Sequence, residues 1–351
     1  MLSLFSSLYG KVADVRNRLY DRGIFESHDL GARVISIGNI TTGGTGKTPL
    51  VAYVANILAE RGEKVCILTR GYGRKDPQNR VLVSDGENIL ATAIESGDEP
   101  FELANRLRSK AMVIADADRV AAAEWAKRKF GVTAFVLDDG FQHRKAKRNV
   151  DIVCIDATNP FGGGKMLPSG RLREPLHNLL RADVIVITRG DLVEDISDLK
   201  FEISNLAPDA AVFVAKNKIV RVVRLEEFNA ETQRPQSGET GEKESRAETV
   251  TIGSRPAFAF CGLGNPENFF KLFLRNNITV NGQLAFRDHY VYSRKDIEKI
   301  KNEARDAGAE VLLTTTKDAV KLSNFKFEIP CFVVEIETEI ENSDGFEVLI
   351  W

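Results

Sequence analysis

The chain has 351 residues, of which 43% are hydrophobic and 28% are charged, and its formal net charge at pH 7 is −2. This length allows two domains with separate cores, and the nearly balanced charge gives no general attraction to nucleic acid. No apolar stretch approaches the roughly 18–20 residues that span a bilayer. The cysteines are widely spaced without a CxxC motif, which is typical of buried, reduced thiols in a cytosolic protein: Cys66, Cys154, Cys261 and Cys331.

The first segment, residues 1–30, is predicted to contain an amphipathic helix. Within residues 2–22 the apolar side chains recur at helical spacing, and the basic side chains fall mostly on other faces. The apolar set is Leu4, Phe5, Leu8, Val12, Val15 and Leu19, and the basic set is Lys11, Arg16, Arg18 and Arg22. Two interpretations remain open: a helix in the interface of an anionic membrane, or a helix packed on its own domain.

Residues 31–210 alternate short β-branched apolar runs with longer helical patterns. The expected strands are residues 33–37, 64–68, 111–115, 133–137, 151–155 and 183–188, and the expected helices between them are residues 47–61, 100–109 and 118–130. Continuous apolar strands separated by helices indicate a mostly parallel sheet with helices on both faces. The fold class is therefore α/β.

A glycine-rich loop joins the first expected strand to the first expected helix, in the sequence GNITTGGTGKTPLVAYVANIL. Glycines let backbone N–H groups approach a phosphate, Lys47 reaches the β- and γ-phosphates, and the hydroxyl of Thr48 binds Mg²⁺. The common pattern GxxxxGK[ST] places glycine at position 41, where this chain has threonine. We predict a P-loop of the NTPase type that binds ATP through Thr41, Gly43, Gly44, Thr45, Gly46, Lys47 and Thr48.

Acidic residues follow the expected strand at 133–137 and begin the expected helix near residue 100. A P-loop requires such a residue near the phosphates to hold Mg²⁺, directly or through water. Asp138 and Asp139 satisfy this requirement, although Asp-Asp-Gly alone is equally typical of a solvated turn. Glu99 is either a further acid near the metal or a favourable charge at a helix start. The predicted metal residues are Thr48, Asp138, Asp139 and Glu99.

The pattern changes after residue 210. Residues 211–215 and 219–225 predict a strand pair, and with the polar stretch at 226–249 they form a β-ribbon linker over 211–256. A second series predicts a smaller C-terminal α/β domain over 257–351. It consists of strands at 257–261, 311–314 and 331–336, a helix after Asn265, and a helix at 293–307.

Segments spread over residues 33–322 resemble, in order, the motifs of the tetraacyldisaccharide 4′-kinase family, the lipid A 4′-kinases: GNITTGGTGKTP, LTRGYGR, GDEP, VLDDGFQHR, NPFGGGKMLPSGRLREP, FCGLGNP, FRDHY and TTTKDAVKL. Threonine at the first loop position is usual in that family. The resemblance implies transfer of the ATP γ-phosphate to the 4′-hydroxyl of a tetraacylated glucosamine disaccharide 1-phosphate, which gives lipid IVA. It also implies a peripheral protein on the cytoplasmic side of the bacterial inner membrane. The polar stretch at 226–249 is longer than the resemblance leads us to expect.

The segment GDEP at residues 97–100 has two interpretations. From the residues alone, Asp98 caps a helix and Pro100 occupies its first turn. The resemblance instead implies that Asp98 is the general base for the sugar hydroxyl and that His289 is its partner. Because the two residues belong to different expected domains, we expect them to meet only when the domains close.

A loop at residues 159–175 combines glycines with basic side chains. A flexible loop of this kind closes over phosphates and supplies charge to the transition state, and Arg171 is the predicted residue for that role. The basic run at 143–148 is more typical of a solvated face.

Three rival functions would also use a P-loop. One is a GTPase, because residues 188–191 loosely resemble a guanine-reading [NT]KxD motif with arginine in place of lysine. Another is a nucleotide-gated membrane-binding module, in which no phosphoryl group is transferred. The third is ATP-driven remodelling of a partner, which hydrolyses ATP without producing a phosphorylated sugar. Comparing ATP with GTP turnover, and testing for a phosphorylated sugar, separates these functions.

Overall fold

The computed structural model describes residues 2–233, 252 and 254–351. The chain forms two compact units, one of Met1–Lys216 with Thr338–Trp351 (unit 1) and one of Asn217–Glu337 (unit 2). Both boundaries fall inside strands, β8 (Ala211–Arg224) and β12 (Cys331–Ile340), and each of these strands contributes to both units.

Unit 1 is built on a sheet with the strand order β8-β7-β6-β1-β5-β2-β4-β3. All of these neighbours are parallel except β3, which runs antiparallel to β4. The strands are β1 (Arg33–Asn39), β2 (Val65–Thr69), β3 (Val81–Ser84), β4 (Ala111–Ala115), β5 (Ala134–Asp138), β6 (Val150–Asp156) and β7 (Val184–Thr188). The predicted mostly parallel α/β sheet is confirmed.

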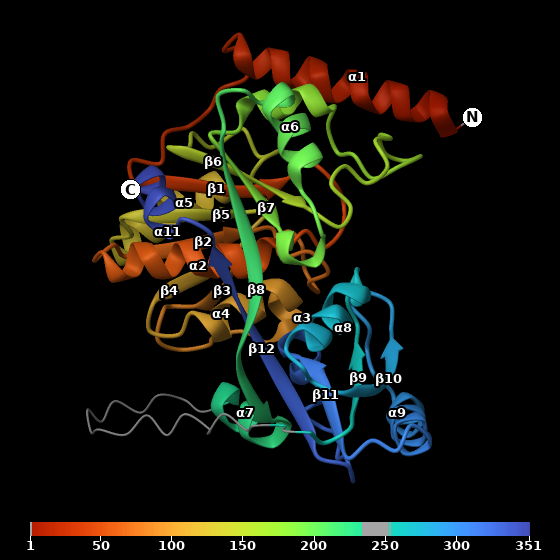
Figure 1. Cartoon of the computed structure of the whole chain (residues 1–351). Coiled ribbons are helices and arrows are strands. Elements are labelled where there is room, and N and C mark those ends of the chain that lie inside the picture. The colour runs from red at the N-terminus through yellow and green to blue at the C-terminus, as the bar shows by residue number, and fades with distance from the viewer. Residues whose placement is uncertain (1, 234–251, 253) are drawn as a thin grey trace. The chain divides into compact units, whose positions relative to one another are not determined.

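Helices cover both faces of this sheet (Figure 1). They are α2 (Lys47–Glu60), α3 (Ala93–Ser96), α4 (Asp98–Arg106), α5 (Arg119–Phe130), α6 (Ser197–Leu206), α11 (Ser343–Ile350) and the 3₁₀ helices η1 (Leu176–Arg181) and η2 (Gly190–Leu192). Successive side chains of β1 point to opposite faces of the sheet. Ile35 packs in a core with Val54 of α2 on one face. Val34 packs in a core with Val120 of α5 on the other face. The core therefore lies on both sides of the strand that leads into the glycine-rich loop.

The last segment of the chain belongs to unit 1 and not to the expected C-terminal domain at 257–351. Phe346 of α11 is fully buried and lies 5.3 Å, centroid to centroid, from the ring of Phe213 in β8. Its ring also lies 6.1 Å from that of Tyr53 in α2. These aromatic contacts hold α11 in the core of unit 1.

The strand pair expected at 211–215 and 219–225 is wrong, because residues 211–224 form the single strand β8 and Leu225 begins α7. The polar residues 216–218 suggest a turn, but they continue the strand. They are partly buried at 216 and 217 and exposed at 218, between a buried stretch in unit 1 and another in unit 2. Lys216 pairs with Glu341 at 2.7 Å. The expected polar linker is also partly a helix, α7 (Leu225–Gln233), while residues 234–249 of the polar stretch lie outside the described residues.

Unit 2 has the strand order β10-β9-β11-β12-β8, with β9 (Ala257–Cys261) parallel to both β10 (Val280–Ala285) and β11 (Val311–Thr315). Its helices are α7, α8 (Pro266–Arg275), α9 (Arg294–Asp306), α10 (Thr316–Ala319) and the 3₁₀ helix η3 (Val320–Leu322). The helices expected after Asn265 and at 293–307 are present. Strand β10 was not predicted, because its sequence VNGQLA alternates in burial and contains few apolar residues.

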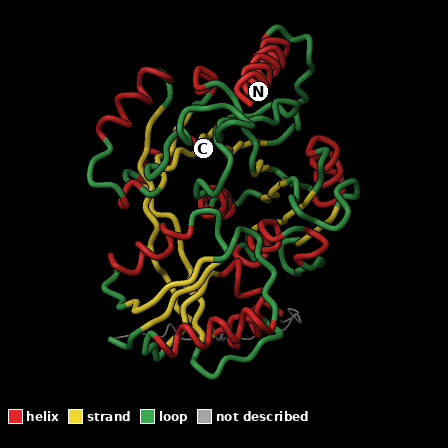
Figure 2. Tube along the Cα trace, turned by 90° about the vertical axis from the view of Figure 1, so that its right-hand side faces the viewer, coloured by secondary structure: helices red, strands yellow, loops and turns green. Residues whose placement is uncertain are grey.

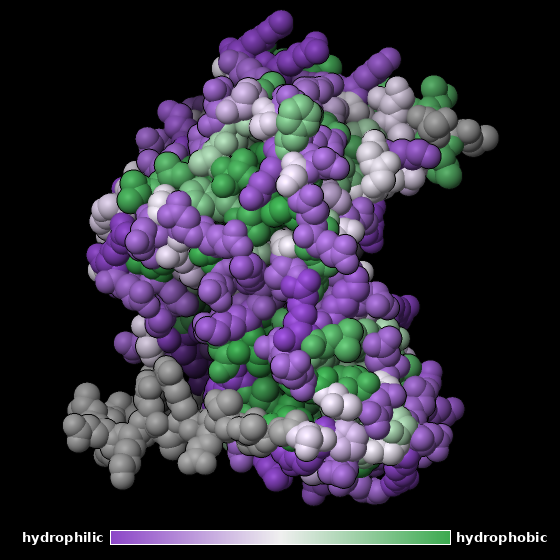
Figure 3. Space-filling model, viewed as in Figure 1, coloured by the Kyte–Doolittle hydropathy of each residue, from purple (hydrophilic) through white to green (hydrophobic). Residues whose placement is uncertain are grey.

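The N-terminal helix α1 (Leu2–Asp21) lies against loops of unit 1 rather than against its strands (Figure 2). It turns small and polar side chains inward, with Ser6, Ala13 and Asn17 buried. Hydrophobic surface is visible at its N-terminal end in Figure 3. Its outward apolar side chains are 53–73% exposed: Leu4, Phe5, Leu8, Val12 and Val15. The helix therefore packs on its own domain and still presents an apolar stripe. Within the described part of the chain, no helix combines the length and hydropathy needed to cross a bilayer.

Candidate active site

The glycine-rich loop has the backbone conformation that a phosphate site requires. Gly46 is the N-cap of α2 with φ 77°, and Gly43 has φ 112°, which are values that residues with a side chain rarely adopt. The N-cap makes no side-chain hydrogen bond to the first turn of α2. The backbone N–H groups at this helix N-terminus thus form a suitable site for an anion.

Two hydrogen bonds hold the middle of the loop through Thr45. Asn39, the last residue of β1, donates from Nδ2 to Thr45 Oγ1 at 2.8 Å. Thr188, the last residue of β7, donates from Oγ1 to the carbonyl oxygen of Thr45 at 2.9 Å. The ends of two strands therefore fix the loop at one residue, and Thr45 acts as an anchor with its side chain buried.

Arg189 has a structural role that differs from the guanine-reading role considered above. It donates from Nη1 to the carbonyl oxygen of Gly44 at 2.8 Å, and the same nitrogen pairs with Asp156 at the end of β6. Its guanidinium therefore helps to hold the glycine-rich loop at residues 40–46, called the phosphate loop below, in position. This contact removes the main support for a guanine-specific motif at residues 188–191.

The loop at 159–175 meets the phosphate loop along a short antiparallel bridge between Thr41 and Leu172. The N–H of Thr42 donates to the carbonyl oxygen of Arg171 at 2.8 Å. The guanidinium carbon of Arg171 lies 3.8 Å from the position that a Cβ on Gly43 would occupy. The structure thus brings Arg171 to the phosphate loop, as its predicted role requires.

Asp139 lies between two cations at the end of β5. Arg173 Nη1 donates to both of its carboxylate oxygens, at 2.7 and 2.6 Å, and Lys47 Nζ lies 3.4 Å from Oδ1. Burial raises the pKa of Asp139, but the charges of Lys47 and Arg173 outweigh it and hold the pKa well below its ordinary value. Asp139 is therefore ionised at neutral pH and helps to fix the position of Lys47.

Asp138 has the opposite environment. Its side chain is buried and accepts a hydrogen bond from Thr69 Oγ1 at 3.0 Å. Burial, and then repulsion from Glu99 and Asp139, raises the pKa of Asp138 to about 6. Asp138 and Asp139 are thus adjacent carboxyl groups with opposite pKa shifts. Among the residues that the structure describes, no three His, Cys, Asp or Glu side chains come together in an arrangement that could hold a metal ion.

The predicted metal residues have donor atoms of the kind that suits a Mg²⁺ ion. Carboxylate and hydroxyl oxygens are the ligands that Mg²⁺ prefers, usually one or two from the protein beside water and phosphate. A divalent cation would also relieve the mutual repulsion that raises the pKa of Asp138. The role of Thr48, Asp138, Asp139 and Glu99 in holding the ion stays a prediction.

Helix α4 begins at Asp98, two residues before the expected start at Pro100. Gly97 is the N-cap, so Asp98 is the first helical residue and not the cap that the residue pattern favoured. A Cβ on Gly97 would lie 2.8 Å from the carbonyl oxygen of Tyr72, in the loop after β2. Strand β2 ends at Thr69, which donates a hydrogen bond to Asp138. Since the loop after β2 contacts Gly97, the start of α4 lies at the same edge of the sheet as Asp138.

His289 belongs to unit 2, where it follows β10 and has a left-handed backbone with φ 57°. Its N–H donates to Oδ1 of Asp288 at 3.0 Å, and Lys317 Nζ pairs with the same carboxylate oxygen at 2.7 Å. The turn that carries the imidazole is therefore fixed by an ion pair. The pairing of His289 with Asp98 stays a prediction, since the two residues belong to different units.

Sequence reasoning did not select Arg173 or Arg119 for the site. Arg119, at the start of α5, is 4% exposed and donates from Nη1 to the carbonyl oxygen of Asp139 at 3.1 Å. Burial lowers the pKa of Arg119, and the charges of Asp138 and Asp139 oppose that effect. The available signal was weak, because Arg119 resembles an ordinary helix-start residue and Arg173 is one of several basic residues in its loop.

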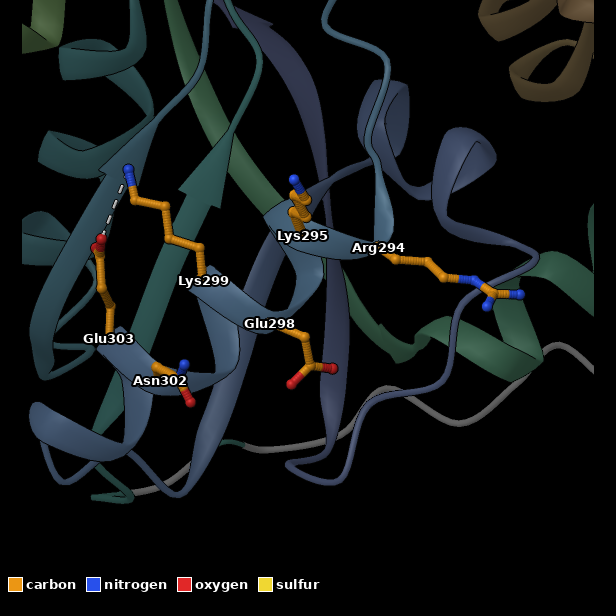
Figure 4. A pocket seen from close by; sticks show the side chains of 6 residues that line it. All are labelled: Arg294, Lys295, Glu298, Lys299, Asn302 and Glu303. Atoms are coloured by element: carbon orange, nitrogen blue, oxygen red, sulfur yellow. Dashed lines mark ion pairs between the residues drawn. The ribbon is translucent and has the colours of Figure 1, made fainter.

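A separate hollow lies along the surface of α9 in unit 2 (Figure 4). Its lining alternates in charge, with Lys299 paired to Glu303 at 3.7 Å. The other residues that line it are Arg294, Lys295, Glu298 and Asn302. A surface of mixed sign does not favour an anionic ligand, and it is typical of a solvated helix face.

The model of one protein family, described as tetraacyldisaccharide-1-P 4′-kinase, matches residues 1–351. The chain belongs to this family. A tetraacyldisaccharide 4′-kinase of Halothermothrix orenii is 38% identical over 332 residues, which cover 92% of this chain and 83% of that relative. One of Desulfotalea psychrophila is 36% identical over 351 residues, covering 98% and 93%. A crystal structure of LpxK from Aquifex aeolicus in complex with ATP matches with a TM-score of 0.75 and 31% identity, covering 99% and 96%.

These relationships confirm the kinase family and the P-loop kinase fold that the sequence predicted. They also support ATP as the co-substrate, because the LpxK structure is of a complex with ATP. The GTPase and the nucleotide-gated binding module are not favoured. The role of Thr41 in binding the nucleotide stays a prediction.

Proposed function

We propose that this chain transfers the γ-phosphate of ATP to the 4′-hydroxyl of a tetraacylated glucosamine disaccharide 1-phosphate. The observation that carries the proposal is the meeting of Lys47, Asp139 and Arg173 beside the phosphate loop. The family description supplies the class of acceptor, because it names a kinase of the 4′ position of a tetraacyldisaccharide 1-phosphate. The reaction is then a phosphoryl transfer to a sugar hydroxyl.

In this proposal the nucleotide phosphates lie against the N–H groups of the loop at the N-terminus of α2. Lys47 neutralises charge on the β- and γ-phosphates, while Asp139 and Arg173 fix its position. Arg171, beside Gly43, adds positive charge as the phosphoryl group moves to the acceptor. Phosphoryl transfer depends mainly on such positioning and charge neutralisation.

Thr48, Asp138, Asp139 and Glu99 would hold Mg²⁺. The ion, when bound, neutralises charge on the β- and γ-phosphate oxygens. Asp138 is better suited to contact it than Asp139, because Asp139 already accepts from Arg173 and pairs with Lys47. The hydrogen bond from Thr69 orients the carboxylate of Asp138 at the end of its strand.

Asp98 is the proposed general base. Its oxygen accepts the proton of the 4′-hydroxyl as the sugar oxygen bonds to the γ-phosphorus and the bond to the β-phosphate oxygen breaks, releasing ADP. As the first residue of α4, Asp98 lies at the positive end of the helix dipole, which favours its ionised form. His289 orients this carboxylate and shares the proton.

The test is incubation with γ-labelled ATP and a glucosamine-disaccharide 1-phosphate lipid, followed by mass analysis. We expect one added phosphate at the 4′ position with the wild-type chain, and none above background with Lys47→Ala. Labelled inorganic phosphate without labelled lipid would instead indicate an ATPase. Replacing ATP with GTP in the same assay checks the nucleotide, and turnover with GTP alone would contradict the proposal.

The proposed location is the cytoplasmic side of the bacterial inner membrane, as a peripheral protein. The exposed apolar stripe of α1 supports it, since Leu4, Phe5, Leu8, Val12 and Val15 have no place in a fully solvated helix face. A lipid acceptor also requires the enzyme to work at an interface. Lys11 and Arg18 are exposed on the same helix and suit an anionic lipid surface.

A further inference from the structure

Helix α1 contacts the loop at 159–175 in three successive places along its length. Near its start, the hydroxyl of Ser6 bonds Ser169 Oγ at 2.8 Å and accepts from the Ser169 N–H at 3.1 Å. At its middle, a Cβ on Gly10 would lie 3.6 Å from the side chain of Met166. Near its end, Asn17 bonds Glu174. The loop that carries Arg171 and Arg173 therefore rests on this helix.

Glu174 is the most buried of these contacts, with a side chain that is 1% exposed. It accepts hydrogen bonds from Asn17 Nδ2 at 2.8 Å and from Arg16 Nη2 at 3.1 Å, both on α1. It also accepts from Arg181 Nη1 of η1 at 2.9 Å. A buried carboxylate with three donors is held in one position, because any movement leaves a charge unpaired.

The residue before Glu174 contacts the residues of the candidate active site. The N–H of Arg173 donates to the carbonyl oxygen of Ile40 at 2.8 Å, and its guanidinium donates hydrogen bonds to the carboxylate of Asp139. A single peptide unit thus joins the contact with α1 to the contact with Asp139.

A second connection runs through Arg181. Its guanidinium lies 4.3 Å from the ring centroid of Phe141, which is two residues after Asp139. Phe141 is fully buried. Glu174 is therefore connected to Asp139 by two chains of contacts. One passes through Arg173, and the other passes through Arg181 and the turn at the end of β5.

We propose that Glu174 is a positioning residue for the kinase reaction, which anchors the 159–175 loop to α1 so that Arg173 holds Asp139 and Lys47 in place. The inference rests on the proposed function of the Lys47–Asp139–Arg173 group. Glu174 contacts α1 and η1, and its effect on the reaction passes through Arg173. A helix that presents an apolar stripe to the outside is thereby connected to the phosphate site.

The first test compares Glu174→Gln with Glu347→Gln. The control removes the charge of a glutamate that pairs with Arg61 at 2.8 Å on the surface of the same unit. We expect kcat to fall at least tenfold for Glu174→Gln, with KM for ATP within twofold of wild type, because small misplacement of charged groups lowers the rate of the chemical step. The control should keep wild-type values. A wild-type kcat for folded Glu174→Gln overturns the proposal.

A double-mutant cycle with Arg173→Ala separates positioning from a general loss of stability. If Glu174 acts through Arg173, Glu174→Gln should lower kcat less than twofold further in the Arg173→Ala background. Multiplicative losses would show that Glu174 acts elsewhere, and would contradict the inference. If Arg173→Ala itself keeps the wild-type kcat, the proposed function of the Arg173–Asp139 pair fails instead. The two failures are thus distinguishable.

A third variant and a different readout cover the case in which Glu174→Gln does not fold. Asn17→Ala removes one donor to Glu174 from the helix side. The substitution also removes the side-chain hydrogen bonds of Asn17 with Asn178 and Arg16. Amide hydrogen exchange should then increase at residues 165–174 relative to Glu347→Gln. Unchanged exchange together with wild-type kcat for Asn17→Ala counts against the proposal.

Discussion

Arg173 donates from Nη1 to both carboxylate oxygens of Asp139, at 2.7 and 2.6 Å. The two residues come from separate segments, and the contact fixes the end of β5 relative to the loop at 159–175. Lys47 lies 3.4 Å from the same carboxylate, so one anion aligns two cations. Because charge-assisted contacts of this kind are directional, the pair positions positive charge before any phosphate arrives.

The first prediction concerns Arg173→Lys. Both contacts with Asp139 come from Nη1, which the planar guanidinium holds in a fixed orientation. A lysine ammonium sits at the end of a flexible stem and is held less firmly in that place while the backbone N–H stays bonded to Ile40. We expect kcat to fall by about 10²-fold, the usual loss for one preorganised donor. Steady-state kinetics at saturating ATP measure it, with Arg305→Lys on the surface of unit 2 as the matched control. Equal kcat for the two variants would argue against a role for the planar contact.

The second prediction concerns the pH dependence of stability. The pKa of Asp138 is raised from 3.8 to about 6, mainly by burial. The folded chain therefore binds this proton more tightly than the unfolded chain does, and the protonated carboxyl stabilises the fold below pH 3.8. This stabilisation is lost as the pH rises from 3.8 through about 6. The loss amounts to about 3 kcal/mol. Thermal unfolding in EDTA should show it for the wild-type chain and not for Asp138→Asn.

Mg²⁺ should reverse this loss, because the ion binds the ionised carboxylate and the site then gains stability with pH. Wild-type chain with Mg²⁺ should be stabilised more at pH 7 than at pH 5, and Asp138→Asn should show little difference. A wild-type unfolding temperature that responds equally to Mg²⁺ at both pH values would contradict the metal assignment.

The parts of this site that could be predicted from sequence are those formed by neighbouring residues. A strand, glycines, Lys47 and Thr48 follow one another directly, and their order alone indicates a phosphate loop. Asp138 and Asp139 are predicted because a P-loop requires an acidic residue at the end of a neighbouring strand to hold Mg²⁺. The burial of each strand follows from its continuous apolar residues.

The remaining contacts depend on residues far apart in the chain. Arg173 lies 34 positions from Asp139, and Glu174 lies 157 positions from Asn17, so no local pattern joins them. The single strand β8 was missed for a related reason, since the polar residues 216–218 resemble a turn until the two units on either side are known. Local sequence patterns are therefore enough to propose the nucleotide site, whereas the contacts around it can be described only from the fold.

The third prediction tests the general base. Asp98→Asn should lower kcat by about 10²–10⁴-fold, because the amide cannot accept the hydroxyl proton, and it should leave ATP affinity within twofold. His289→Ala should lower kcat less, since the imidazole acts through the carboxylate. His177→Ala is a suitable control, because His177 is an exposed histidine that pairs with Asp14 on α1. Near wild-type turnover for Asp98→Asn would remove Asp98 from the mechanism.

The last prediction concerns the apolar stripe of α1. Phe5 and Leu8 are 53% and 58% exposed, and they lie three residues apart on one face of the helix. Replacing both with glutamate puts charge where acyl chains would be contacted and adds repulsion from anionic headgroups. We expect pelleting with vesicles of anionic phospholipid to fall at least fivefold, while kcat on detergent-dispersed acceptor stays within twofold of wild type.

The matched control is Leu274→Glu, at an apolar residue of unit 2 that is 75% exposed, and it should pellet like the wild-type chain. If both variants pelleted equally, the stripe of α1 would have no particular role at the membrane. If pelleting fell and activity fell equally in detergent, the substitutions would have disturbed the packing of α1 on the 159–175 loop, and unfolding temperatures would reveal that disturbance.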